Sequence, residues 1–178
     1  MAIAPALKGK KVVLQNHDQK FVSPRYVAWL NDPEVVRHSE QRFKKHSLKS
    51  CREYVRSYQN NPSLLWAIIV QEGRVHIGNI CAIVDARNKT AELRILIGDK
   101  SYYGQGLGLE SWKLVCDYLL SKGGMRKVFA GTLALNKGML SIMKKMKMKP
   151  QGVWEKHYLV NGKTVDLILA AKFSKKNI

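Results

Sequence analysis

The sequence of 178 residues predicts one α/β (α+β) domain, residues 1–178, in which helices flank a mixed, mainly antiparallel central sheet. Three observations predict this class. Three strand-like segments follow one another across short turns. A glycine-rich segment and an amphipathic helix come next, and two strand-like segments around an Asn-Gly pair end the chain. The predicted order is β-α-α-β-β-β-α-β-α-β-β.

The N-terminal part of the chain is expected to form one strand and two helices. Residues 11–15 (KVVLQ) are a short strand. Ser23 followed by proline is typical of a helix N-cap and first turn, and the NDP segment at 31–33 ends or redirects that helix. A second helix begins at the cap residue Ser47, because apolar residues recur at helical spacing after it.

The middle of the chain is expected to form three antiparallel strands. Residues 64–70 are an apolar strand, a Glu-Gly turn leads into residues 74–86, and a polar turn leads into residues 90–98. These three strands precede the glycine-rich segment.

The C-terminal part is expected to complete the sheet. Residues 109–122 form an amphipathic helix that stops at a Gly-Gly pair. Residues 127–135 are a strand and residues 136–147 a helix. The Asn161-Gly162 pair then predicts a tight hairpin between two final strands.

The composition places the chain among globular proteins, with 46% hydrophobic and 8% aromatic residues. No apolar run reaches the roughly 18 residues that span a bilayer, and the first residues lack the segment order of a signal peptide. Cys51, Cys81 and Cys116 lack metal-ligand spacing and lie in apolar or amphipathic segments. We therefore expect buried reduced thiols, no metal, no membrane contact and a cytoplasmic location.

The net charge is +18, from 31 Lys and Arg against 13 Asp and Glu. This excess predicts attraction to anions without naming one. Nucleic acid or the ribosome, an anionic membrane and a highly charged nucleotide ligand are all compatible with it, and a diffuse charge that only keeps the protein soluble is the plain alternative.

Three glycines at alternate positions, Gly104, Gly106 and Gly108, lie between a strand and a helix. Uncrowded amide groups at a helix N-terminus suit a pyrophosphate, although a tight turn also explains glycines. The segment is not a Walker A loop, because no Gly-Lys-Ser/Thr follows. It also departs from G-x-G-x-x-G, and antiparallel strands precede it instead of repeated β-α-β units.

Residues 103–108 (YGQGLG) resemble the Gln/Arg-x-x-Gly-x-Gly/Ala pyrophosphate loop of the GNAT (Gcn5-related) N-acetyltransferases. The resemblance covers nearly the whole chain, and the predicted order of elements is that of this family. The RimJ/RimL-like branch is most similar, since its members often show segments like WLNDPE (29–34), HIGN (76–79) and GDK (98–100).

The resemblance implies acetyl-CoA as co-substrate and a GNAT-like fold. It implies that loop amides bind the pyrophosphate, that the end of the preceding strand pairs with the pantetheine arm, and that the residue opening a later helix contacts the same arm. The residues so implicated are Leu96, Ile97, Gly98, Tyr103, Gly104, Gln105, Gly106, Leu107, Gly108 and Asn136. Tyr103 departs from the usual Gln or Arg, although an aromatic residue is frequent there in this branch.

Glu92 is the candidate catalytic residue. Its neighbours Ala91 and Leu93 belong to the apolar face of the strand, so Glu92 lies on the opposite face. Only a neutral amine attacks a thioester, and a carboxylate there is suited to remove its proton. The resemblance places a catalytic Glu at this position. The alternative is a solvated carboxylate paired with Arg94 or with a base on the next strand.

The general acid is not assigned, because Met143 stands where many relatives have a tyrosine that protonates the leaving thiolate. Helix packing explains Met143. Either another group such as Ser141 or Tyr158 acts, or the thiolate leaves without dedicated help.

The acceptor pocket is expected near Trp29, Asn31, His157 and Tyr158, although packing and helix termination explain the first two equally well.

Three functions follow from the resemblance and the charge. The favoured one is direct transfer of an acetyl group to a small amine, such as an amino sugar linked to a nucleotide. The alternatives are acetylation of a protein N-terminus of the ribosomal type and a non-catalytic basic module that binds CoA or RNA. The chain is expected to be a monomer or a homodimer.

Overall fold

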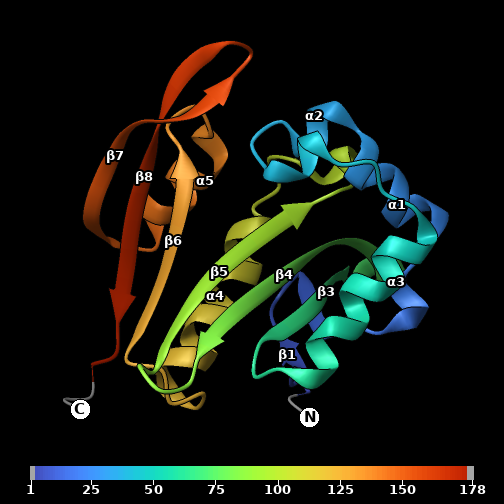
Figure 1. Ribbon diagram of the computed structural model, residues 1–178. Coiled ribbons are helices and arrows are strands. Elements are labelled where there is room, and N and C mark those ends of the chain that lie inside the picture. The colour runs from blue at the N-terminus through green and yellow to red at the C-terminus, as the bar shows by residue number, and fades with distance from the viewer. Residues whose placement is uncertain (1–2, 176–178) are drawn as a thin grey trace.

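Residues 3–175 are described by a computed structural model, in which eight strands form one sheet (Figure 1). The strand order is β1-β2-β3-β4-β5-β6-β8-β7, and every neighbouring pair is antiparallel except β5 and β6. The mixed, mainly antiparallel sheet confirms the predicted fold class. The strands are β1 (Leu7–Lys8), β2 (Val12–Asn16), β3 (Leu64–Val70), β4 (Val75–Asp85), β5 (Thr90–Ile97), β6 (Lys127–Leu133), β7 (Lys149–Val160) and β8 (Lys163–Phe173).

Five α-helices lie in the described part of the chain, and the predicted caps begin two of them. Ser23 caps α1, and Ser47 forms a reciprocal capping box with Ser50 at the start of α3. The prediction missed two short elements, β1 and α2, and placed the start of α4 too late in the sequence. The helices are α1 (Pro24–Asn31), α2 (Pro33–Val36), α3 (Leu48–Ser57), α4 (Leu107–Ser121) and α5 (Lys137–Lys145).

Short 3-10 helices connect these elements: η1 (Gln19–Phe21), η2 (Glu40–Phe43), η3 (Tyr58–Asn60), η4 (Glu72–Arg74) and η5 (Lys100–Tyr102). The predicted hairpin turn is present, since Asn161 and Gly162 both have positive φ, at 51° and 75°, as a type I′ turn requires. Within residues 3–175, no helix has the length and apolar character needed to cross a membrane.

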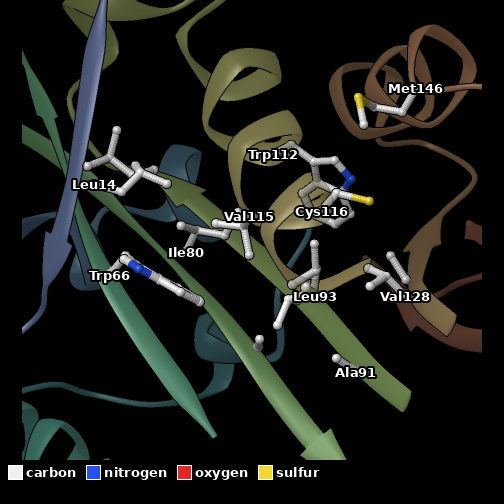
Figure 2. Close-up of a cluster of buried hydrophobic side chains, with 14 of the residues drawn as sticks. Leu14, Trp66, Ile80, Ala91, Leu93, Trp112, Val115, Cys116, Val128 and Met146 are labelled. Carbon is white, nitrogen blue, oxygen red and sulfur yellow. The ribbon is translucent and has the colours of Figure 1, made fainter. Parts of the chain in front are cut away.

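Alternate residues of the strands enter two hydrophobic clusters, one on each face of the sheet. On one face, Trp66 and Leu93 pack with Trp112 of α4 in a core that is closed by α5 (Figure 2). On the other face, Leu65 packs with Tyr26 of α1 and with α3. Because side chains of a strand alternate between faces, the two clusters separate an α4/α5 face from an α1/α3 face.

A group of aromatic rings fills the space beside α1. The rings of His17 and His76 lie 5.6 Å apart, and Phe21, Tyr26 and Trp29 surround them at 5.1–6.3 Å. His76 Nε2 donates a hydrogen bond to the Gly78 carbonyl at 2.9 Å, which gives this histidine a structural role. Both ring nitrogens of His17 are buried and have no partner among the described residues.

Burial lowers the pKa of His17 to about 3 and that of His76 to about 4. The unfolded chain therefore takes up protons below a pH of about 6.5 that the folded chain does not, and the folded state loses stability as the pH falls from there toward 4.

We expect the free energy of unfolding to fall by up to about 1.4 kcal/mol per pH unit for each of these two histidines between pH 6 and 5. Urea unfolding at a series of pH values measures this slope. The variant His17→Phe removes one of the two groups, so its slope over the same interval is expected to be smaller. Parallel curves for the variant and the wild type would contradict the assignment.

Candidate active site

The sheet is split along part of the boundary between β5 and β6. Their parallel pairing covers only Thr90–Glu92 with Lys127–Phe129, and the strands then diverge (Figure 1). A cavity of about 1040 Å³ occupies this place. It is lined on the α1/α3 face by Glu92, Arg94 and Leu96, and on the α4/α5 face by residues that include Ile95 and Ile142. The cavity therefore passes through the sheet from one face to the other.

The backbone of β5 presents hydrogen-bonding groups to this gap. Gly98 donates its amide to the Ile77 carbonyl, which directs the backbone groups of Gly98 and, by alternation, of Leu96 toward β4. The groups of Ile95 and Ile97 then face away from β4 and into the gap. This differs from the prediction that the Leu96, Ile97 and Gly98 backbone together pairs with a ligand arm, because adjacent residues of a strand face opposite edges.

The N-terminus of α4 has no side-chain cap. Its N-cap residue is Gly106, with φ of 81°, and the amides of Gly106, Leu107 and Gly108 have no hydrogen-bond partner among the described residues. A Cβ at Gly104 or Gly106 would meet no atom within 4 Å. The space outside the helix end is open, and its free amides and dipole favour an anion.

The loop before α4 is bound to α1 and α2 by packing and by ion pairs. A Cβ at Gly98 would overlap the ring of Trp29, so only glycine permits this close approach. Lys100 pairs with Asp32 at 3.0 Å and with Glu34 at 2.7 Å. The WLNDPE and GDK segments are thus in mutual contact. Their shared structural role is to position the glycine loop.

Side chains of the loop are engaged within it. The Tyr103 hydroxyl donates to the Ile97 carbonyl at 3.0 Å, and Gln105 Nε2 donates to the Ser101 carbonyl at 2.9 Å. The Ile97 amide is then the group of that residue left to face the gap. Asn136 caps α5 through its side-chain oxygen, which accepts from Met139, and it also lines the cavity.

Glu92 lies on the cavity wall and is bound by Arg94. Two hydrogen bonds of 2.9 and 2.8 Å join the guanidinium to the two carboxylate oxygens. This bond raises the pKa of Arg94. The structure therefore shows both features that the sequence raised as alternatives: Glu92 faces the cavity, and it is paired with Arg94.

Met143, which replaces the usual tyrosine, and the two candidate acids Ser141 and Tyr158 lie in different surroundings. Met143 is buried in the core, and Ser141 is exposed and outside the cavity lining. Tyr158 lines the cavity. A bulge in β7 positions it, and the Lys156 amide in this bulge donates to Asp166 Oδ1 at 2.7 Å.

A tyrosine pair on the cavity wall was missed by the sequence reasoning. The hydroxyls of Tyr54 and Tyr58 are 2.8 Å apart, and both residues line the cavity beside Cys81. Burial raises the pKa of Tyr58, which keeps its hydroxyl protonated. The four-residue spacing of the two tyrosines was the available signal, but it equally describes a packing face of a helix.

All three cysteines are buried and free, and no metal-binding group of three or more His, Cys, Asp or Glu occurs among residues 3–175.

The four predicted acceptor residues have different positions. Trp29 is buried in the cluster on the α1/α3 face, outside the cavity lining. Asn31 is also outside it, and its side chain bonds the backbone of His46. His157 is exposed and makes edge-to-face ring contacts with Trp154 and Tyr158. Tyr158 alone of the four lines the cavity.

Solved structures of similar fold include several acetyltransferases. RimL, described as a ribosomal L7/L12 alpha-N-protein acetyltransferase in complex with coenzyme A, aligns with a TM-score of 0.86 at 16% identity over 97% of this chain and 100% of that chain. The microcin C7 self-immunity acetyltransferase MccE, in complex with acetyl-CoA and AMP, aligns with a TM-score of 0.80 at 16% identity over 97% and 98%. A spermidine N-acetyltransferase SpeG chimera from Vibrio cholerae and hSSAT aligns with a TM-score of 0.80 at 16% identity over 92% and 96%.

The sequence itself matches a family model. No curated protein sequence matches the chain significantly. The model of the acetyltransferase (GNAT) domain matches residues 14–149, which is most of the chain. The sheet, the uncapped helix end and the cavity agree with that match. The chain therefore belongs to the GNAT acetyltransferase family and is an acetyl-CoA-dependent N-acetyltransferase.

Proposed function

We propose that this enzyme acetylates the primary amine of a small molecule, with Glu92 as the group that accepts the proton of the amine. The observation that carries the proposal is the cavity itself. Glu92 and Asn136 both line it at the gap between β5 and β6, and Trp112 brings α4, whose N-terminal amides are free, to the same cavity.

The residues present fit acetyl-CoA, which supplies an acetyl group activated as a thioester. The amides of Gly106, Leu107 and Gly108 would bind the pyrophosphate, and the backbone of Ile95 and Ile97 would pair with the pantetheine amides. Asn136 reaches the same cavity from the start of α5. No side chain fills the space outside Gly104 and Gly106, which leaves room for phosphate oxygens.

Glu92 is suited to a proton-accepting role. Its side chain is 27% exposed, so it meets both the cavity and water, and Arg94 fixes its orientation through two hydrogen bonds. An amine that loses its proton to this carboxylate attacks the thioester directly in a ternary complex. Tyr54 of α3 and Tyr58 of η3 line the same cavity, and their hydroxyls are 2.8 Å apart.

A small acceptor such as an amino sugar linked to a nucleotide is favoured, because it combines an amine with the anionic groups that a basic protein attracts. A protein N-terminus is the second candidate. Phe43 and Leu159 are 69% and 64% exposed, and Arg42 joins their two segments by donating to the Leu159 carbonyl. Such exposed apolar groups near the cavity are typical of a surface that contacts a polypeptide.

The glycine loop provides the first test of this proposal. We expect Gly106→Ala to weaken CoA binding at least about tenfold, because the new methyl group occupies the space beside the free amides. The same change forces an L-residue into left-handed backbone and costs about 1–2 kcal/mol of stability.

Gly124→Ala is the matched control, since Gly124 also has positive φ and open surroundings but lies beyond the other end of α4. It is expected to lose similar stability and no CoA affinity. Isothermal titration with CoA and thermal unfolding measure the two effects. Equal CoA affinity in folded Gly106→Ala and wild type would refute the loop assignment.

Glu92 provides the second test. We expect Glu92→Gln to lower kcat by about 10²–10⁴-fold and to leave CoA affinity unchanged, because the amide retains the shape but not the basicity of the carboxylate. Thiol release from acetyl-CoA across a panel of amines measures kcat. Arg94→Gln keeps the carboxylate and is expected to retain most of the activity. Equal losses in the two variants would show that the ion pair, and not the base, is what the reaction needs.

A further inference from the structure

We propose that residues 38–46 form a binding site for a phosphate group carried by the acceptor amine, with Lys44 and Lys45 as its cations. This inference rests on the proposed acetyl transfer to a small amine and names the chemical class of that amine. The segment lies between α2 and α3, and His38, Lys44, Lys45 and His46 all line the cavity.

The charges around the cavity do not balance. Glu40 is paired with Arg42 at 3.1 Å and Glu92 with Arg94 at 2.8 Å, so both acidic residues of the cavity lining are neutralised. Lys44 and Lys45 have no acidic partner within the described part of the chain. Two adjacent unpaired ammonium groups attract an anion and repel a polyamine.

His38, which also lines the cavity, has a donor group without a partner among the described residues. Its Nε2 accepts a hydrogen bond from Arg37 Nε at 3.2 Å, so in the neutral ring the proton is on Nδ1. Burial and the neighbouring Arg37 and Arg42 lower the pKa of His38, which keeps the ring neutral at pH 7. The Nδ1–H group is buried and has no partner among the described residues, so a rotation of the ring toward the cavity that His38 lines is needed before it donates to an anion there.

The segment is held in place by contacts with Asn31 of α1 and by a hydrogen bond within itself. Asn31 donates to the His46 carbonyl at 2.9 Å and accepts from the His46 amide at 2.8 Å. Arg42 donates to the Ser39 carbonyl at 3.0 Å, and its side chain is 14% exposed. Asn31, expected from the sequence to lie in the acceptor pocket, thus acts as a positioning residue for the segment that lines it.

This site is distinct from the one that suits the pyrophosphate of the co-substrate. Lys44 and Lys45 precede α3, which packs on the α1/α3 face of the sheet. The free amides of Gly106–Gly108 begin α4, which packs on the opposite face. An anion bound by the two lysines therefore belongs to a molecule that enters from the acceptor side of the cavity.

The test compares each neutral amine with a counterpart that carries a phosphate or a uridine diphosphate, using protein saturated with CoA. Isothermal titration is carried out with ethanolamine against O-phosphoethanolamine and with glucosamine against UDP-glucosamine. We expect at least one phosphate-bearing amine to bind about tenfold or more tightly than its neutral counterpart. The first pair represents a phosphate monoester and the second a nucleotide diphosphate, so the two sources of phosphate are distinguished.

The variant Lys44→Gln/Lys45→Gln is expected to abolish this preference while CoA affinity is retained. Lys8→Gln/Lys122→Gln removes the same charge from exposed positions outside the cavity and is expected to retain the preference. Equal affinity for both members of each pair, or an undiminished preference in the first variant, would overturn the inference. Phosphate preference without thiol release from acetyl-CoA would instead refute acetyl transfer to these amines and leave the phosphate site standing.

Discussion

The divergence of β5 from β6 is the constraint on which the rest of the site depends. After Glu92 and Phe129, each strand remains paired only on its outer side, β5 with β4 and β6 with β8. The inner edges then carry backbone groups that need partners from water or from a ligand. A cavity therefore opens through the sheet at its centre, and it joins the face that carries α4 to the face that carries α1 and α3. An uninterrupted sheet would have separated the two substrates of a transfer reaction.

The glycine loop is held in position by contacts that are remote from the chemistry. Trp29 packs against Gly98 so closely that no Cβ is tolerated, and Lys100 binds two carboxylates of the segment after α1. The same surroundings include the buried pair of histidines, whose lowered pKa values make this region sensitive to acid. Rigid packing around the loop allows the amides of α4 to remain free without a side-chain cap, since the loop does not depend on their hydrogen bonds for its conformation.

The charged side chains that line the cavity do not neutralise one another. Each acidic side chain of the lining has a guanidinium partner, whereas the lysines of the segment before α3 have no acidic partner in the described range. The net charge of +18 was visible in the sequence, but a count does not say where unpaired charges gather. Only the folded chain places Lys44 and Lys45 at the cavity, because the segment that carries them has no periodicity and its position is set by Asn31.

The sequence by itself determined the order of the main elements, their caps and the face of β5 that carries Glu92, because period, caps and turn residues are local properties. Local signals did not reveal the two-residue strand β1 or the single-turn helix α2, which are too short to show a period. Tertiary structure alone decided which backbone groups of β5 face the gap, where Tyr54 and Tyr58 meet, and that Trp29 and Asn31 support the site without lining it. These features depend on strand register and on contacts between residues far apart in the chain. The chemistry of the donor could therefore be inferred from a short motif, whereas the selection of the acceptor arises from the assembled cavity.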